Sequence, residues 1–259
     1  MTETNPLPVE SRIDDRVLFV TIRRAAKRNT LSSAVLSGLR DIFTIHAGDH
    51  SLVAAVLTGE GDRAFAAGGD LHEFDAARSR DAAETLARLA TEALDSVRRF
   101  PVPVVAVLNG DALGGGSELA VACDFRILAS HARIGFIQAE LAIPTGWGGG
   151  GDLARLVGGR AALDMLVRAQ KFDSRAALAA GLADLVAEEG CLTDALDSAL
   201  SVLRSRSPQV LRAIKAVTRP SAVAAMSKLE FDHFVDCWLH PDHWAAHDAI
   251  VGSLGAKRD

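Results

Sequence analysis

The 259-residue sequence has few cysteines, no long apolar run and no excess of positive charge, and each shortage excludes a class of protein. Cys123, Cys191 and Cys237 are odd in number and far apart, so they predict neither a disulfide framework nor a metal-ligand pair. No apolar stretch is long enough to span a bilayer. The N-terminal segment lacks the apolar core of a secretory signal. We therefore expect a cytoplasmic protein without a membrane partner.

The charge balance argues against a nucleic-acid partner. Lys and Arg number 28 and Asp and Glu number 33, which gives a formal net charge of −5. Non-specific binding to nucleic acid would require a positively charged face. A mildly acidic protein can still hold an anion through backbone amides and a few cations. Hydrophobic residues make up 49% of the chain, which excludes a mainly disordered protein.

The first part of the chain repeats a strand, a glycine-bearing turn and a helix. Alternating or continuous apolar runs indicate strands at residues 16–23, 52–58, 104–110 and 124–129. Polar starts followed by helical periodicity indicate helices at residues 33–45, 81–99 and 117–122, the first capped by Ser32 or Ser33. This repetition predicts an α/β core.

The remainder is expected to be almost purely helical. The expected helices cover residues 161–169, 174–180, 193–206, 208–217, 222–239 and 242–254. The last two carry apolar stripes, which must cover either the protein's own core or a neighbouring subunit. We divide the chain into a core domain at residues 1–195, which carries the functional site, and a helical region at residues 196–259 that caps the core or contacts a neighbouring subunit.

Two glycine-rich segments follow predicted strands. They are residues 65–71 (FAAGGDL) and residues 109–119 (NGDALGGGSEL). Glycines at a helix start leave backbone N–H groups bare and allow a ligand to approach closely, while the helix dipole adds partial positive charge. Such amides stabilise a thioester oxygen that becomes an enolate, by about 3–4 kcal/mol for each donor in comparable acyl-transfer sites.

Glu118 follows Gly115 by three residues, which places both on one face of a helix. A carboxylic acid beside an oxyanion hole can move a proton at the carbon next to the carbonyl. The alternative is that Glu118 only complements the dipole of its own helix. The spacing alone leaves both interpretations open.

Three long segments resemble the crotonase, or enoyl-CoA hydratase/isomerase, family. They are AFAAGGDL at residues 64–71, NGDALGGGSELAVACDFRIL at residues 109–128 and IGFIQAELAIPTGWGGGGDLARLVG at residues 134–158. The resemblance runs from about residue 24 through the helical tail. It implies a spiral of ββα units with a C-terminal helical layer, assembled as a homotrimer or a dimer of trimers.

The resemblance also implies roles for individual residues. Gly69 and Gly115 correspond to the oxyanion donors, and Glu118 corresponds to the first catalytic glutamate. Gln138 stands where the family usually has a second glutamate. An amide can orient a group but cannot exchange protons near neutral pH. Glu140 takes the second-acid role only through a register shift, since residues i and i+2 of a strand share a face.

The tail adds a finer resemblance. Its FxxxWxxxDHxxA pattern (Phe234, Trp238, Asp242, His243 and Ala246) and the WGG of residues 147–149 are similar to family members that decarboxylate malonyl-type CoA esters. We therefore favour decarboxylation, with enoyl-CoA hydration or isomerisation in lipid metabolism as the alternative. A non-catalytic binding protein of the same family is a more remote third interpretation.

Further contacts with an acyl-CoA substrate are expected from residues around the two segments. These are Ala67, Asp70 and Leu71 in the first segment, Arg24 and Lys27 for the CoA phosphates, Trp147 as a wall of the acyl pocket, and Glu140. Arg24 and Lys27 are equally explained as ordinary solvated charges. We expect no metal and no cofactor apart from the CoA of the substrate. His240, His243 and His247 have a spacing compatible with a metal but are interpreted as tail packing or surface residues.

Overall fold

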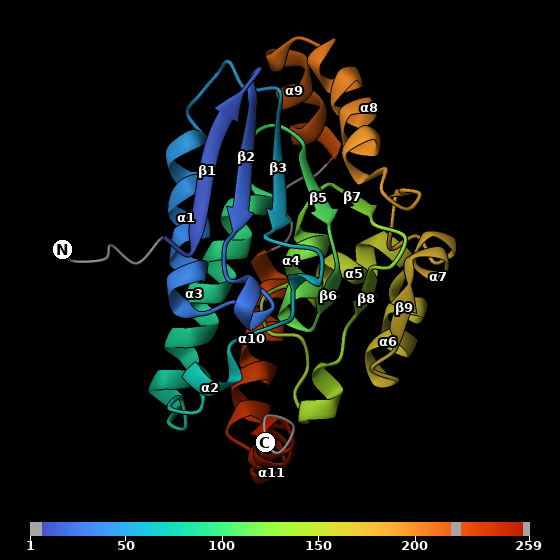
Figure 1. The fold of residues 1–259 in the computed structure, drawn as a ribbon. Coiled ribbons are helices and arrows are strands. Elements are labelled where there is room, and N and C mark those ends of the chain that lie inside the picture. Colours follow the sequence, from blue (N-terminus) through green and yellow to red (C-terminus); the bar gives the residue numbers. More distant parts are fainter. Residues whose placement is uncertain (1–6, 219–223, 256–259) are drawn as a thin grey trace, which may run out of the picture.

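The computed structural model describes residues 7–218 and 224–255, and it builds their core on two β-sheets (Figure 1). The strands are β1 (Val9–Asp14), β2 (Val17–Ile22), β3 (Ala54–Gly59), β4 (Ala64–Ala66), β5 (Val104–Leu108), β6 (Asp111–Leu113), β7 (Phe125–Leu128), β8 (Arg133–Gly135), β9 (Lys171–Asp173) and β10 (Leu185–Val186). The larger sheet has the order β1-β2-β3-β5-β7-β10 and the smaller has the order β4-β6-β8-β9. Only β1 and β9 run antiparallel to their neighbours.

Helices connect and cover these sheets. The α-helices are α1 (Ser33–His46), α2 (Leu71–Phe74), α3 (Arg80–Arg98), α4 (Gly115–Ala122), α5 (Gly149–Val157), α6 (Gly159–Val167), α7 (Ser174–Ala179), α8 (Leu192–Arg204), α9 (Pro208–Thr218), α10 (Ala224–Trp238) and α11 (Pro241–Gly255). The short 3-10 helices are η1 (Ala25–Lys27) and η2 (Gln138–Leu141). In Figure 1, α8 and α9 lie at the upper end of the molecule and α11 at the lower end.

The chain repeats one structural unit three times. A strand of the larger sheet is followed by a strand of the smaller sheet and then by a helix, as β3-β4-α2, β5-β6-α4 and β7-β8-η2. The parallel pairing of β4 with β6 brings the turns after these two strands to the same edge of the smaller sheet. The predicted α/β spiral of ββα units is thereby confirmed, and its repetition is what brings the two glycine-rich segments together.

The long helices begin and pack as their sequences predict. The Ser32 hydroxyl accepts a hydrogen bond from Val35 N at 3.3 Å, so Ser32 is the N-cap of α1 and Ser33 is its first residue. Ser79 caps α3 in the same way. The buried positions of α1 recur every three or four residues, and its Phe43 ring meets Phe100 edge-on at 5.2 Å.

The apolar tail covers the protein's own core. Phe234, Val235 and Trp238 of α10 are buried in the main hydrophobic cluster. The Trp238 indole N–H donates to the carbonyl of Ala77 at 2.7 Å, which ties α10 to the segment before α3. Of the two expected partners of the tail, α10 therefore packs against the protein's own core.

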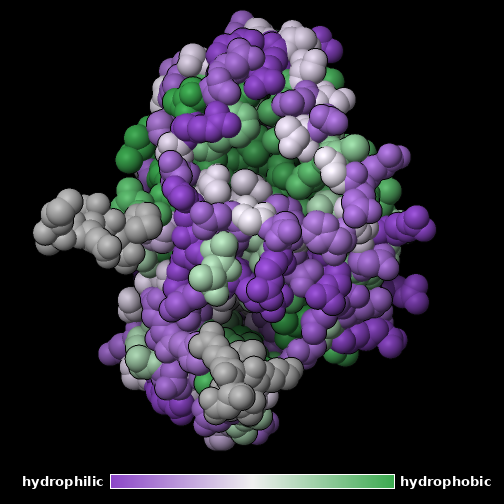
Figure 2. Space-filling model, in the orientation of Figure 1, coloured by the Kyte–Doolittle hydropathy of each residue, from purple (hydrophilic) through white to green (hydrophobic). Residues whose placement is uncertain are grey.

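A second, smaller core joins α8 and α9 to the larger sheet. Val56, Val105 and Val107 on the sheet are buried with Leu200 of α8 and Leu211 of α9. On the face of the molecule drawn in Figure 2, hydrophobic residues also gather at the surface of the upper part, whereas the lower part is mainly hydrophilic. The boundary proposed between residues 195 and 196 falls inside α8, and the two-domain division stays a prediction.

Several short elements depart from the sequence-based expectation. The six-residue strand β1 precedes the first expected strand, and β4 and β6 lie outside the expected strands. β9 and β10 lie in a region expected to be purely helical. Strands of two or three residues carry too little periodicity to identify, and they form because a neighbouring strand offers hydrogen bonds. Within the described parts of the chain, no helix combines the length and apolarity needed to cross a membrane.

Candidate active site

The two glycine-rich turns adjoin each other at the edge of the smaller sheet. β4 pairs with β6 through Ala66 and Ala112, and the turns follow directly. Gly68 and Gly114 both have positive φ, 96° and 55°. A methyl group on Gly114 would lie 4.0 Å from the Gly68 α-carbon, so the tips of the turns are in contact. The predicted juxtaposition of the two segments is therefore present.

The backbone N–H groups of Gly69 and Gly115 have no acceptor among the described residues. Leu31 bridges Gly69 by donating to Gly68 O at 2.8 Å and accepting from Asp70 N at 3.3 Å, which leaves the Gly69 N–H on the opposite side. Gly115 is the first residue of α4, where an N–H has no intrahelical partner. The site thus offers two unsatisfied amides on adjoining turns.

Two aromatic rings pack against these glycines. A methyl group on Gly115 would lie 2.1 Å from Cζ3 of Trp147, and one on Gly69 would lie 2.6 Å from Cε2 of Phe74. Both rings are buried. No side chain fits at either glycine, and the Trp147 ring lies against Gly115, while its role as a wall of the acyl pocket stays a prediction.

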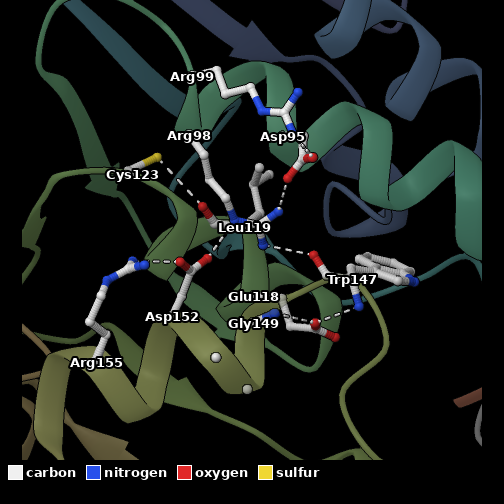
Figure 3. A network of polar contacts seen from close by, with 12 residues as sticks. Asp95, Arg98, Arg99, Glu118, Leu119, Cys123, Trp147, Gly149, Asp152 and Arg155 are labelled. Carbon is white, nitrogen blue, oxygen red and sulfur yellow. Dashed lines mark hydrogen bonds and ion pairs between the residues drawn. The ribbon is translucent and has the colours of Figure 1, made fainter. Parts of the chain in front are cut away.

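The Glu118 carboxylate is buried and held by three close hydrogen bonds. Oε1 accepts from Gln138 Nε2 at 2.9 Å, and Oε2 accepts from Trp147 N at 2.9 Å and Gly149 N at 3.0 Å. Figure 3 shows the carboxylate beside Trp147 and Gly149. The backbone amides that it meets therefore belong to the loop before α5 and to the first turn of α5, not to its own helix α4.

The surroundings of Glu118 change its affinity for a proton. Burial, followed by repulsion from Glu230, raises the pKa of Glu118 to about 7, against the opposing effect of the three hydrogen bonds. Its ordinary value is 4.5. At neutral pH both the acid and the carboxylate are populated, which is the condition for a group that gives and takes protons during turnover.

Gln138 lies beside Glu118, and Glu140 does not. Gln138 is the first residue of η2, is buried, and leaves its Oε1 without a partner among the described residues. Glu140 is exposed and pairs with Lys171 at 3.5 Å. The register-shift argument for Glu140 assumed a strand, whereas η2 is a 3-10 helix, in which residues i and i+2 face different directions. The structure brings Gln138, rather than Glu140, to the site.

The residues expected at the CoA phosphates differ in their availability. The Arg24 guanidinium donates to Asp70 Oδ2 at 2.9 Å and to Thr30 O at 2.7 Å, so its charge is already matched. Burial raises the pKa of Asp70, but the hydrogen bond and charge of Arg24 outweigh it, and the net pKa is lowered. Lys27 is exposed on η1.

Two other residues expected to contact the substrate, Ala67 and Leu71, make backbone hydrogen bonds to neighbouring segments. Ala67 N donates to Arg28 O at 3.1 Å, directly before the first glycine turn. Leu71 opens α2, and its carbonyl is bonded to the ring of His247 at 3.2 Å. Both residues lie beside Gly69 along the chain, while their contact with substrate stays a prediction.

A buried ion pair supports the loop that carries Trp147. Arg98 at the end of α3 donates to Asp152 Oδ2 and to Trp147 O, both at 2.7 Å (Figure 3). Asp95 and Arg155 extend the network, and Asp95 also pairs with exposed Arg99, so that three positive and two negative charges alternate. The backbone of Trp147 is thus held on both sides, because its N–H donates to Glu118 and its carbonyl accepts from Arg98.

The sequence reasoning missed Arg98, Asp152 and Glu230. Arg98 follows Leu94 by four positions on the apolar stripe of α3. A charged residue at such a core position could have indicated a buried ion pair. Glu230 of α10 accepts from Gly150 N at 3.0 Å and Gly151 N at 3.4 Å. No local pattern connects Glu230 to a loop about 80 residues earlier.

Two of the tail histidines, His243 and His247, are buried in the packing of the tail, whereas His240 is exposed and lies 3.5 Å from Asp242. His243 is fully buried against Trp238, with ring centroids 4.4 Å apart, and its Nδ1 bonds to Leu141 O at 2.8 Å. Asp75, His247 and Asp248 have potential ligand atoms within 4.8 Å of one another. Arg78 forms ion pairs with both carboxylates of that group, which accounts for their charge without a metal ion.

Known proteins share this fold and sequence pattern. The enoyl-CoA hydratase/isomerase family model matches residues 12–235. The chain is 36% identical over 212 residues to 2,3-dehydroadipyl-CoA hydratase of Escherichia coli, which covers 82% of this chain and 81% of that protein. It is 32% identical over 192 residues to ethylmalonyl-CoA decarboxylase of Gallus gallus, which covers 72% and 64% respectively. A solved enoyl-CoA hydratase from Bacillus halodurans has the same fold, with a TM-score of 0.88 at 20% identity over 93% of this chain and 99% of that one.

The chain belongs to the enoyl-CoA hydratase/isomerase family, because the family model spans most of its length. It is therefore an enzyme of a family that acts on acyl-CoA esters. The family resemblance of the glycine segments is confirmed, and the particular reaction is the subject of the proposal below.

Proposed function

We propose that this enzyme decarboxylates a malonyl-type acyl-CoA through a thioester enolate. The enolate oxygen is held by the amides of Gly69 and Gly115. Two observations support this placement: neither amide has an acceptor within the described chain, and the two turns that carry them are in contact. Donors fixed in advance of the reaction act where negative charge develops, each contributing about 3–4 kcal/mol in comparable sites.

The proposed reaction needs one proton donor. The bond between the α-carbon and the carboxylate breaks, carbon dioxide leaves, and the electron pair passes into the thioester carbonyl to give the enolate. The α-carbon then takes a proton from Glu118, which regains one from solvent. A pKa of about 7 leaves a large protonated fraction of Glu118 at neutral pH, and this fits the role of donor.

The observation that favours decarboxylation is the Gln138 amide at 2.9 Å from Glu118. The family resemblance gives this position to a second carboxylate. Hydration uses two carboxylates to hold and split one water molecule, and an amide cannot replace a group that exchanges protons. Decarboxylation requires no base, so a single acid is sufficient.

Hydration or isomerisation of an enoyl-CoA is the second candidate. The 36% identity to 2,3-dehydroadipyl-CoA hydratase of Escherichia coli favours it. In this alternative Glu118 transfers the proton at the α-carbon and Gln138 only orients water. The same oxyanion amides would serve either reaction, so the two candidates differ in the second proton-transfer group.

A screen of purified enzyme against short, branched and malonyl-type CoA esters tests the proposal. We expect release of carbon dioxide from methylmalonyl- or ethylmalonyl-CoA. Rapid loss of crotonyl-CoA absorbance without any such release would assign the enzyme to hydration instead. Failure to bind or convert any CoA ester would contradict the catalytic proposal as a whole.

The remaining parts of the proposal concern substrate contacts and assembly. Lys27 is the exposed cation available for CoA phosphates, and Ala67, Leu71 and Trp147 line the thioester and acyl groups. The enzyme needs no cofactor or metal beyond the CoA of its substrate and works in the cytoplasm as a homotrimer or a dimer of trimers. Light scattering coupled to size-exclusion chromatography tests the assembly, and a monomeric mass would contradict it.

A further inference from the structure

Two carboxylates from distant parts of the chain share the N-terminus of α5. Gly149 N donates to Glu118 Oε2 at 3.0 Å, and the next amide, Gly150 N, donates to Glu230 Oε1 at 3.0 Å. Gly151 N also points to Glu230, at 3.4 Å. Consecutive amides of one helix turn are therefore divided between an acid of α4 and an acid of α10.

Sharing one helix terminus makes each carboxylate less favourable as an anion. The partial positive charge at the start of a helix stabilises a nearby negative charge, and a second carboxylate opposes the first. Glu118 is 2% exposed, whereas Glu230 is half-buried. Water can screen the charge of Glu230 but not that of Glu118, so the repulsion between the two carboxylates mainly destabilises the ionised form of Glu118.

The other charged groups near this terminus are paired among themselves. On the α3 side, Arg98 bonds to Asp95 and Asp152, and Asp152 also pairs with Arg155. Exposed Arg99 also pairs with Asp95, so this group carries three positive and two negative charges, each bonded to a neighbour of opposite sign. Glu230 is the neighbour whose charge opposes the ionisation of Glu118.

The neighbouring charges on α10 have partners of their own. Lys228 pairs with Asp232 at 2.7 Å, and Asp236 pairs with Arg80 of α3 at 2.7 Å. Arg88 of α3 lies over the ring of Phe231, with its Cζ 6.0 Å from the centroid. Lys228 and Asp232 are exposed, and the Arg80 and Arg88 contacts join α10 to α3, whereas Glu230 turns toward α5.

We propose that Glu230 is a positioning residue that sets the proton affinity of Glu118 from the shared N-terminus of α5. Helix α10 of the C-terminal region thereby takes part in the acid–base chemistry without touching the substrate. This inference rests on the proposed function, because it takes Glu118 as the proton-transfer group. The hydrogen bonds of Glu230 with Gly150 N and Gly151 N need only an acceptor oxygen, whereas this role also needs the negative charge of Glu230.

Glu230→Gln is the direct test, because the amide keeps an oxygen for Gly150 N and removes only the charge. The pKa of Glu118 is followed in the free enzyme by carbon-13 NMR of its carboxyl group, assigned with Glu118→Gln. We expect the pKa of Glu118 to fall by about one unit, the effect of removing a nearby like charge. The pH at which turnover is half lost should fall by the same amount.

Two variants serve as controls. Asp232→Asn removes an exposed charge from the same helix and should leave the pKa of Glu118 unchanged. Glu230→Asp keeps the charge and should stay closer to the wild type than Glu230→Gln. An unchanged Glu118 pKa in Glu230→Gln, or an equal fall in Asp232→Asn, would overturn the inference.

A measurement on the unmodified enzyme covers the case in which Glu230→Gln does not fold. Raising the salt concentration screens half-buried Glu230 more than the buried contacts of Glu118, so the pKa of Glu118 should fall as salt is added. A pKa that does not respond to salt would count against Glu230. Because the NMR titration needs no turnover, a shift seen in an enzyme that converts no CoA ester would reject the proposed function and keep the coupling.

Discussion

The side-chain amide of Gln138 donates a 2.9 Å hydrogen bond to the carboxylate of Glu118, and both residues are buried. The contact joins η2 to α4 and places an amide beside Glu118, the acid that follows the second glycine turn. The Gln138 carbonyl oxygen stays without a partner in the described structure. The site is therefore arranged around one proton-transfer group and one free hydrogen-bonding atom.

Restoring a carboxylate at position 138 should change the reaction. We expect Gln138→Glu to increase crotonyl-CoA hydration at least about tenfold, because a general acid or base contributes 10²- to 10⁴-fold when well placed. Decarboxylation should fall as the second negative charge repels the substrate carboxylate. Both activities are measured on the same preparation. Glu140→Gln, at an exposed neighbouring position, should alter neither.

Removing the acid should stop turnover and preserve binding. Glu118→Gln cannot donate a proton, so kcat is expected to fall about 10²- to 10⁴-fold. The CoA ester should still bind, because the amides of Gly69 and Gly115 are unchanged. Isothermal titration and single-turnover kinetics separate the two effects. Full activity in this variant would show that another group protonates the enolate.

The pH dependence follows from the raised pKa of Glu118, about 7. The donor is active when protonated, so its active fraction is nearly complete below pH 6 and falls as the pH rises through about 7. We therefore expect kcat for decarboxylation to decrease with increasing pH and to be half lost near pH 7. A rate that rises through the same range would mean that Glu118 works as a carboxylate base.

The buried ion pair beneath the loop should matter for stability. Arg98→Met leaves Asp152 buried without its main partner, and loss of one member of such a pair costs about 3–5 kcal/mol. Arg99→Met removes an exposed neighbour, and its effect should stay within about 0.5 kcal/mol. Urea unfolding of the two variants gives the comparison. Equal stabilities would contradict the structural role assigned to Arg98.

Residual activity of Arg98→Met provides a second measurement on the same variant. Arg98 holds the carbonyl of Trp147, whose N–H holds Glu118. In the folded fraction we expect a lower kcat with a smaller change in KM, since the substrate-contacting residues remain. An increase in KM alone would place Arg98 in substrate binding instead.

Regular elements of ordinary length were predictable from the sequence because their periodicity is local. The cap at Ser32 and the limits of α6 to α11 lie within about three residues of expectation. The short strands β4, β6, β9 and β10 were missed because each depends on a partner strand distant in the sequence. The glycine segments singled out by the family motifs nevertheless lie at the edge where β4 and β6 meet.

The site was predictable where chemistry follows a motif and unpredictable where it follows packing. Glu118, Gln138 and Trp147 lie together as the motif spacing suggested. The expected free charge of Arg24 is instead matched by Asp70, and Glu230 reaches the site from the tail helix. The Arg24–Asp70 pair and the position of Glu230 both depend on the packing of segments far apart in the chain, which cannot be predicted from a local sequence pattern.

The decisive measurement for the proposed decarboxylation is carbon dioxide release from ethylmalonyl-CoA by the purified wild-type enzyme. We expect release at a rate that exceeds the hydration of crotonyl-CoA under the same conditions, and loss of that release in Glu118→Gln. No release, together with rapid hydration of crotonyl-CoA, would contradict it.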